Sequence, residues 1–137
     1  MIVLDTDVLS EAMRFDSVAL AWLDQQPRAS LWTTAITIFE LRFGLTIMPS
    51  GRRQTLKLAE FDRMIEEDLE RRVLPFDNAA AEQAAALMSR RRRAGRPVES
   101  RDTMIAGIAL AQRATLATRN VRHFDDLDVP VVDPWNP

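Results

Sequence analysis

At 137 residues, the chain is long enough for one domain with a sizeable buried core. Hydrophobic residues make up 47% and charged residues 28%, which excludes a disordered chain, and a formal net charge of −2 gives no general attraction for nucleic acid. The absence of cysteine excludes disulfides, a thiolate nucleophile and a cysteine-based zinc site, and the single histidine, His123, excludes a histidine-rich metal site. Lys57 is the only lysine among 18 basic residues, an excess of arginine that fits either phosphate recognition or a GC-rich coding bias.

The longest stretches free of charge, residues 29–39 and 103–112, are shorter than the roughly 20 apolar residues that a membrane span needs. Asp5 and Asp7 interrupt the first apolar segment, so it does not have the pattern of a signal peptide. We therefore expect a soluble, cytoplasmic protein.

Short apolar segments alternate with longer helical segments along the chain. This alternation predicts a three-layer α/β/α fold with a central, mostly parallel five-stranded sheet, in a single domain spanning residues 1–137. The breaks at residues 49–51 and 94–97, which contain glycine and proline, separate predicted helices. The predicted strands are 2–4, 31–34, 73–75, 116–118 and 129–132, and the predicted helices are 8–13, 18–25, 37–48, 52–70, 79–93 and 100–113.

Two of the predicted helices differ from the others in composition. Residues 52–70 are strongly charged, so this helix is expected to protrude, to pair with helix 37–48 and to form with it a clamp for a dimer partner or another protein. Residues 100–113 are rich in small apolar side chains that let a helix approach a sheet closely, so this helix is expected to be central and buried.

Four acid or amide side chains follow predicted strands at the points where helices begin: Asp5, Glu40, Asp102 and Asn120. The carboxyl ends of parallel strands line one crevice, so these residues are expected to converge. Burying the unpaired charge of Asp5 directly after an apolar strand would cost several kcal/mol, which favours a ligand role. Carboxylates gathered without basic partners need a cation, and the sequence therefore predicts an acidic, metal-binding pocket.

Each of the other acids also has a structural interpretation. Glu40 stands three residues after Thr37, which is the spacing of a capping box. Asp102 lies in the first turn of its helix, where the macrodipole favours a carboxylate by roughly 0.3 to 1 kcal/mol. Asp7 is interpreted first as an N-cap of the helix that follows it, and Asn120 is a candidate cap of a turn. A purely structural role explains any one of these residues more easily than it explains all four together.

The order and spacing of several motifs resemble those of the PIN-domain ribonucleases, in particular VapC-type toxins of bacterial toxin–antitoxin pairs and their FitB-like branch. The resemblance covers almost the whole chain, and its single motifs are weak but their order is specific. The motifs are IVLDTDVLSE at residues 2–11, TAITIFELRFG at 34–44, DTMIA at 102–106, ATRNVRHF at 117–124 and VDPW at 132–135.

The resemblance implies an endoribonuclease dependent on Mg²⁺ or Mn²⁺, in which a metal-activated water hydrolyses an RNA phosphodiester bond. Asp5, Glu40 and Asp102 are the implied metal ligands, with Glu40 either a ligand or the base for the attacking water. Asn120 completes the implied catalytic set. Many relatives carry Asp at this fourth position, so the neutral Asn120 leaves room for fewer or weaker metal sites.

Residues around the implied site receive supporting roles. Thr6 and Thr118 are candidates to orient water or carboxylates, and His123 stands where many relatives carry a further acid, so it is either a structural residue or a general acid. The basic run is a candidate RNA-binding patch, with a solvated helix end as the alternative. Its residues are Arg90, Arg91, Arg92 and Arg93.

The resemblance also implies partners: an RNA substrate, a second copy in a homodimer and a VapB- or FitA-like antitoxin that covers the acidic site. Two other classes of function are alternatives. The segment 4–8 also matches the start of haloacid-dehalogenase-like phosphatases, but these need a well-placed lysine, and Lys57 lies in a charged helix. The other alternative is a non-catalytic PIN-like binding module.

Overall fold

The computed structural model describes residues 1–14, 18–97 and 99–137. Its central sheet has five strands in the order β3-β2-β1-β4-β5, and every neighbouring pair is parallel. The predicted mostly parallel, five-stranded α/β fold is therefore confirmed, and the sheet is parallel throughout. The strands are β1 (Ile2–Leu4), β2 (Leu31–Thr34), β3 (Val73–Leu74), β4 (Thr115–Ala117) and β5 (Val131–Val132).

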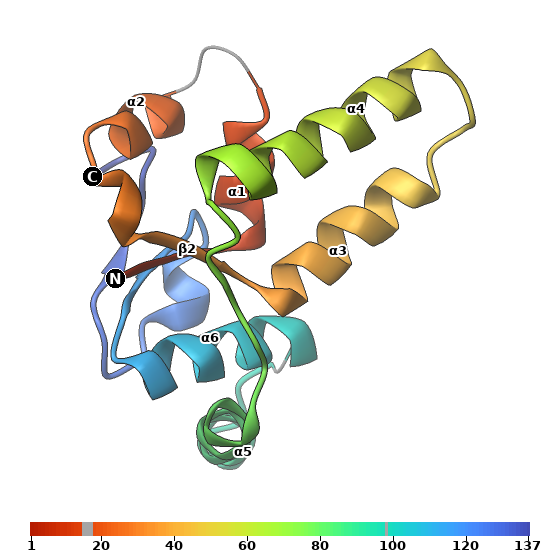
Figure 1. The fold of residues 1–137 in the computed structure, drawn as a ribbon. Helices are drawn as coiled ribbons and strands as arrows, with labels where there is room; N and C mark the ends of the chain where they lie inside the picture. Colours follow the sequence, from red (N-terminus) through yellow and green to blue (C-terminus); the bar gives the residue numbers. More distant parts are fainter. Residues whose placement is uncertain (15–17, 98) are drawn as a thin grey trace.

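Helices cover both faces of this sheet (Figure 1). Successive side chains of a strand point to opposite faces, so Val3 packs in the core under α5 and α6 while Leu4 packs in the core with α1 and α4. Leu116 and Ala117 divide in the same way on β4. The helices are α1 (Thr6–Ala12), α2 (Val18–Asp24), α3 (Ala35–Thr46), α4 (Arg52–Arg63), α5 (Asn78–Arg93) and α6 (Ser100–Gln112).

The strand order places a change of direction beside β1. The chain builds outward from β1 through β2 to β3, then returns to add β4 on the other side of β1, with β5 beyond it. In open parallel sheets this switch point leaves a crevice at the carboxyl ends of the two strands. The residues that follow β1 and β4 therefore face each other across that crevice.

Helices α3 and α4 form a hairpin that protrudes from the body (Figure 1). The predicted pairing of these helices is observed: Arg42 of α3 bonds to Asp62 of α4 over 2.5 Å, and its guanidinium lies 4.8 Å from the centroid of the Phe61 ring. The side chain of Gln54 donates to the carbonyl oxygens of Leu45 and Thr46 in the last turn of α3, and to that of Met48 just beyond it, and so ties the two helices at their tip. The clamp function of the hairpin stays a prediction.

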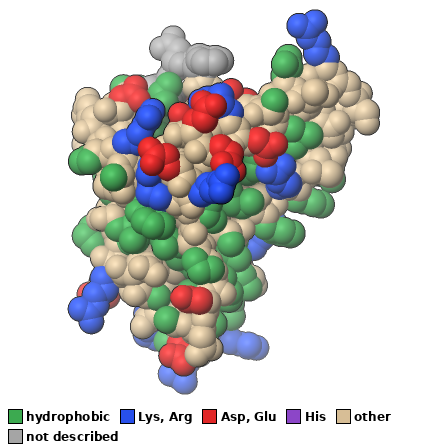
Figure 2. Space-filling view, viewed as in Figure 1, with side chains coloured by type: hydrophobic (Ala, Val, Ile, Leu, Met, Phe, Trp, Pro, Cys, Tyr) green, Lys and Arg blue, Asp and Glu red, His purple; other side chains and the backbone are tan. Residues whose placement is uncertain are grey.

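The helix predicted at 52–70 is divided in the structure. Regular α-helix ends at Arg63, a π-turn (η2, Met64–Asp68) follows, and Glu70 and Arg71 adopt positive φ angles of 47° and 59° before β3. Acidic and basic side chains alternate over this region of the surface (Figure 2), where Arg63 bonds to both Glu60 and Asp68. These charges neutralise one another, so this face carries no field of one sign.

Helix α6 is central and buried, as its composition predicts. At Gly107 an added Cβ would lie 2.6 Å from the Ala80 carbonyl oxygen and 2.7 Å from the Ala84 Cβ of α5. Only glycine fits such a close approach. In the described residues, no helix has the length and hydropathy that a bilayer crossing requires.

Candidate active site

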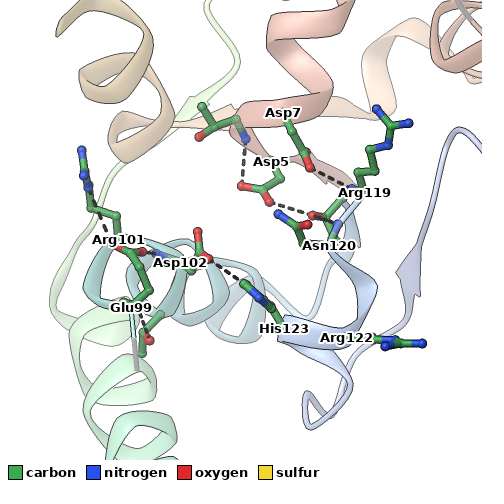
Figure 3. A network of polar contacts seen from close by, with 12 residues as sticks. Asp5, Asp7, Glu99, Arg101, Asp102, Arg119, Asn120, Arg122 and His123 are labelled. Atoms are coloured by element: carbon green, nitrogen blue, oxygen red, sulfur yellow. Dashed lines mark hydrogen bonds and ion pairs between the residues drawn. The ribbon is translucent and has the colours of Figure 1, made fainter. Parts of the chain in front are cut away.

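The four predicted site residues come from four parts of the fold. Asp5 follows β1, Glu40 lies in α3, Asp102 lies in the first turn of α6, and Asn120 follows β4. The crevice at the switch point brings Asp5, Asp102 and Asn120 toward one another (Figure 3). Glu40 is linked to this group by a hydrogen bond from the hydroxyl of Thr6, the residue after Asp5.

Asp5 is the most buried of the acids, with 4% of its surface exposed. Its Oδ1 accepts a hydrogen bond from the Thr6 backbone N–H, and its Oδ2 accepts one from the Thr118 hydroxyl, each over 2.8 Å. Burial removes the water that stabilises the charged form, and the nearby Asp7 adds repulsion, so the pKa of Asp5 is raised to about 7. The chain thus holds a carboxylate where ionisation is costly without a cation.

Asp7 is the site residue that the sequence interpretation missed. The interpretation of Asp7 as an N-cap is wrong, because Asp5 is the residue that caps α1. Asp7 instead accepts a hydrogen bond from the Arg119 backbone N–H at its Oδ2, over 3.0 Å, while its Oδ1 is buried without a hydrogen-bond partner among the described residues. Burial raises the pKa of Asp7 as well. The sequence signal for this role was the pair of acids, Asp5 and Asp7, on either side of Thr6.

Glu40 does not cap a helix, so the capping-box interpretation is also wrong. Thr34 is the N-cap of α3, and its hydroxyl accepts the Thr37 backbone N–H over 3.1 Å. Glu40 lies beyond the first turn, where its Oε1 accepts a hydrogen bond from the Thr6 hydroxyl over 3.0 Å. Its Oε2 is 3.9 Å from the guanidinium of Arg101. Partial burial is the main cause of a raised pKa at Glu40.

Asp102 faces the crevice from the start of α6. Its backbone N–H donates to the side chain of Glu99, the N-cap of that helix, and its Oδ2 lies 3.4 Å from the Nδ1 of His123. His123 is mostly exposed, at 62% of its side chain, whereas 26% of the Asp102 side chain is exposed. Asn120 makes no capping hydrogen bond with its side chain, and its N–H donates to the Thr118 hydroxyl over 3.1 Å. Its amide is therefore free of a capping role.

The basic run at the end of α5 is divided by the fold. Arg91 is 4% exposed, and its guanidinium donates to both carboxylate oxygens of Asp126, over 2.8 and 2.9 Å, and to the His123 carbonyl oxygen. This contact lowers the pKa of Asp126. For Arg91 both earlier interpretations, an RNA contact and a solvated helix end, are wrong, because the side chain is a buried tie between α5 and the segment that carries His123. The exposed members of the run are Arg90, Arg92 and Arg93.

The donor set of the crevice fits a hard cation. Its side-chain ligands are carboxylate and amide oxygens, which Mg²⁺ and Mn²⁺ prefer. The Oδ1 of Asp7, which lacks a hydrogen-bond partner among the described residues, and the raised pKa of Asp5 both indicate carboxylates that a cation would stabilise. Within the described ranges, no three or more acidic or histidine side chains are gathered closely enough to hold an ion together. An ion here would be held by one or two carboxylates and several waters, which is the usual coordination of Mg²⁺.

A parallel α/β fold with an acidic crevice at its switch point defines the class of this protein, and comparison with known proteins specifies it. The model of the PIN domain family matches residues 2–130. The chain is 39% identical to the VapC ribonuclease Y4jK of Sinorhizobium fredii, over 100% of this chain and 99% of that protein. It is 33% identical to the toxin FitB of Neisseria gonorrhoeae, over 99% of each. The chain belongs to the PIN-domain family.

Solved structures agree with this assignment. A structure of FitAB bound to an IR36 DNA fragment contains a chain that matches this one with a TM-score of 0.90 and 32% identity, covering 100% of this chain and 97% of that one. A DNA-bound VapBC from Salmonella typhimurium matches with a TM-score of 0.83 and 25% identity, covering 97% of each chain. The resemblance found in the sequence is thereby confirmed.

Proposed function

We propose that this chain is a Mg²⁺- or Mn²⁺-dependent endoribonuclease that acts as the toxin of a type II toxin–antitoxin pair. Similarity over the full chain to a VapC ribonuclease and to the toxin FitB supports the class of activity. The single structural observation that supports a metal-dependent reaction is the buried Oδ1 of Asp7, which has no hydrogen-bond partner in the part of the chain that the structure describes, beside the buried carboxylate of Asp5. Hydrogen bonds offset only part of the cost of burying these two carboxylates, and a bound cation would offset more of it.

Asp5 and Asp102 would hold the ion, with Glu40 and Asp7 completing the negative field around it. The ion, when bound, polarises the phosphate and neutralises charge that develops on it. Thr118 fixes the orientation of the Asp5 carboxylate through its hydroxyl hydrogen bond. A fixed carboxylate loses little freedom when it takes up a ligand, so binding is stronger than it would be for a mobile side chain.

In this proposal, Glu40 accepts a proton from the attacking water. Its raised pKa makes it a stronger base than an exposed glutamate, and the Thr6 hydroxyl holds one of its oxygens in place. As the bond from water oxygen to phosphorus forms, the bond from phosphorus to the leaving oxygen breaks, and that oxygen takes a proton from solvent. The Asn120 amide donates a hydrogen bond to the substrate or to a water at the rim.

The antitoxin is proposed to bind in a groove between α1, α3 and α4, with a cavity volume of about 330 Å³. Four apolar side chains line this groove together with Ser10, Gly44 and the charged side chains of Arg14, Glu40, Lys57 and Glu60. A peptide with apolar side chains and one basic side chain fits this lining, because the base would pair with Glu40 and block the crevice. The apolar lining consists of Met13, Leu41, Leu45 and Leu56.

A homodimer is proposed to form through the outer face of α3. Phe39, Phe43 and Ile47 are spaced four residues apart on that face and are 58%, 53% and 65% exposed. The Phe39 and Phe43 rings are stacked with centroids 6.3 Å apart. Figure 2 shows hydrophobic side chains at the surface along this hairpin. Contiguous exposed apolar groups of this kind mark interaction surfaces.

Nuclease activity of the purified chain tests this proposal. With Mg²⁺ or Mn²⁺ the wild type should cut RNA, and EDTA should abolish cutting. Asp102→Asn should be inactive while remaining folded by circular dichroism, and Asp128→Asn, a matched change at an exposed position away from the crevice, should be fully active. Cleavage that is equally fast in EDTA, or in Asp102→Asn, would show that the metal site is not responsible.

The same samples separate the alternatives. Hydrolysis of small phosphate esters without RNA cleavage would support the phosphatase interpretation, which the PIN-family match over residues 2–130 already disfavours. RNA binding without cleavage under any metal would support a non-catalytic module. Sequencing of RNA ends after brief expression of the chain in cells would identify the RNA and the cleavage position.

A further inference from the structure

Arg119 stands at the rim of the acidic crevice with its backbone fixed. It follows Thr118, and its N–H donates to the Asp7 carboxylate over 3.0 Å. The next residue, Asn120, bonds back to the Thr118 hydroxyl. Figure 3 shows the Arg119 side chain extending from this rim away from Asp102. The base of the side chain is thus anchored to the site itself.

The guanidinium of Arg119 is also held at its far end. It lies over the ring of Trp135, 4.8 Å from the centroid. The Trp135 ring packs against the core on the α1 side, and its backbone N–H donates to the Asp133 side chain over 2.9 Å. Stacking uses the face of the guanidinium and leaves the N–H donors in its plane free. An arginine ordered in this way loses little conformational freedom when it binds an anion.

Among the described residues, Arg119 has no carboxylate in direct contact, in contrast to Arg91 and Arg101. Its charge acts on the buried Asp7 from a distance, where it offsets part of the effect of burial on the pKa of that carboxyl. Arg101 lies within 4 Å of Glu40 and of Glu99, and Arg91 is bonded to Asp126. In the described part of the chain, Arg119 forms no ion pair and donates no side-chain hydrogen bond. Arg122 likewise has no ion pair there, but no aromatic ring holds it in place. Arg119 is therefore an ordered, available cation.

Binding of RNA at an acidic crevice requires positive charge for the neighbouring phosphates, and Arg119 can supply it. The crevice is lined by carboxylates, which repel the phosphates on both sides of the one that is cut, and a cation at the centre of the site compensates for one phosphate. We propose that Arg119, stacked on Trp135, binds the RNA phosphate next to the phosphate that is cut. This inference rests on the proposed ribonuclease function. In this arrangement the acidic crevice takes the RNA phosphate that is cut, and Arg119 takes the neighbouring phosphate.

Binding of a short, single-stranded, fluorescein-labelled RNA tests the assignment. The protein carries Asp102→Asn in every sample, so that the RNA stays intact, and anisotropy is measured in Mg²⁺ over a range of NaCl concentrations. Arg119→Gln should weaken binding about tenfold and should flatten the log–log salt slope by about 0.7, the value for one phosphate contact on a single strand. Arg119→Lys should keep the slope and recover part of the affinity, because charge remains while the planar fork is lost.

Two further variants separate phosphate binding from a structural role. Trp135→Leu should weaken RNA binding while leaving the salt slope intact, since the charge remains but its ordering is lost. Arg53→Gln makes the same charge change near the start of α4, at the tip of the hairpin, and should bind RNA as the parent does. In the active protein, Arg119→Gln should raise KM more than it lowers kcat.

Unchanged affinity and unchanged salt slope in Arg119→Gln, relative to Arg53→Gln, would overturn the inference. A lower melting temperature accompanied by a normal salt slope would likewise show that the arginine only secures the turn around Trp135. If the parent protein neither binds nor cuts RNA, the proposed function fails instead. The two failures are therefore distinguishable.

Discussion

The Thr118 hydroxyl donates to the Asp5 carboxylate over 2.8 Å, although the two residues are 113 positions apart in the chain. They follow β1 and β4, which are neighbouring parallel strands on either side of the switch point. The hydrogen bond stabilises the ionised form of Asp5, but desolvation outweighs it, so the pKa remains raised to about 7. The fold thus holds a carboxylate in position at the expense of its own stability.

Asp5 is expected to make the metal-free protein less stable as pH rises. Its pKa is 3.8 in the unfolded chain and about 7 in the folded protein. Between these values the unfolded state releases a proton that the folded state keeps, so raising pH favours unfolding, and the full penalty, on the order of 4 kcal/mol, is present above about pH 7. Asp5→Asn removes this penalty, so its stability relative to wild type should improve steadily from about pH 4 to about pH 8.

Urea unfolding in EDTA at several pH values measures this difference. The substitution also alters hydrogen bonds to Thr6 and Thr118, but that change is independent of the titration of Asp5 and shifts all pH values together. Asp128→Asn, at an exposed position, is the matched control. Parallel stability curves for wild type and Asp5→Asn over this pH range would contradict the raised pKa.

Metal binding should offset the loss of stability that the ionised Asp5 causes. An ion that binds only the folded state stabilises it by about 2.7 kcal/mol at 100 times its dissociation constant. The ion competes with the proton on Asp5, so the stabilisation by Mn²⁺ or Mg²⁺ should be larger near pH 8 than near pH 5. Asp102→Ala should lose most of the effect. Thermal unfolding across a metal titration measures it, and a melting temperature that does not respond to either ion would argue against a site.

Arg91 is expected to be a stability residue. Arg91→Met should destabilise the fold by about 3 kcal/mol, at the low end for a broken buried ion pair because its partner Asp126 is partly exposed and rehydrates. Arg92→Gln, one position along the same helix but exposed, should change stability by less than about 0.5 kcal/mol. Chemical unfolding of both variants checks this. Equal effects would mean that the Arg91 contacts contribute little.

The sequence predicted the elements well because each strand is short, apolar and bounded by polar residues. The sequence pointed to Asp5 because burying an unpaired acid directly after a strand is costly, whereas Glu40 and Asp102 lie in helices, and the resemblance to a known family was needed to single them out. Asp7 was missed because an acid near the start of a helix has an ordinary explanation as a cap. The burial of its Oδ1 becomes visible only in the fold, where β4 lies beside β1. Arg91 was missed for a related reason: Asp126, its partner, is 35 positions away, and helical periodicity does not reveal it.

The exposed arginines of α5 remain candidates for RNA binding. Replacing Arg90, Arg92 and Arg93 together by Gln removes three positive charges without touching the buried Arg91. If all three contact phosphates, the log–log salt slope of RNA affinity should flatten by about 2, at about 0.7 for each contact on a single strand. Anisotropy titrations at several salt concentrations measure the slope. An unchanged slope would leave these side chains as a solvated helix end.

Phe43 is expected to be central to self-association. It lies between Phe39 and Ile47 on the exposed face of α3, and in a two-fold dimer any substitution occurs on both sides of the interface. Phe43→Glu would place two like charges in or near an apolar contact, so the dimer should dissociate at least tenfold more readily. Val18→Glu changes another exposed apolar residue, at the start of α2, and should leave assembly unchanged. Light scattering across a concentration series measures the mass of both variants, and a Phe43→Glu protein that stays dimeric at the same concentrations as Val18→Glu would place the interface on another face.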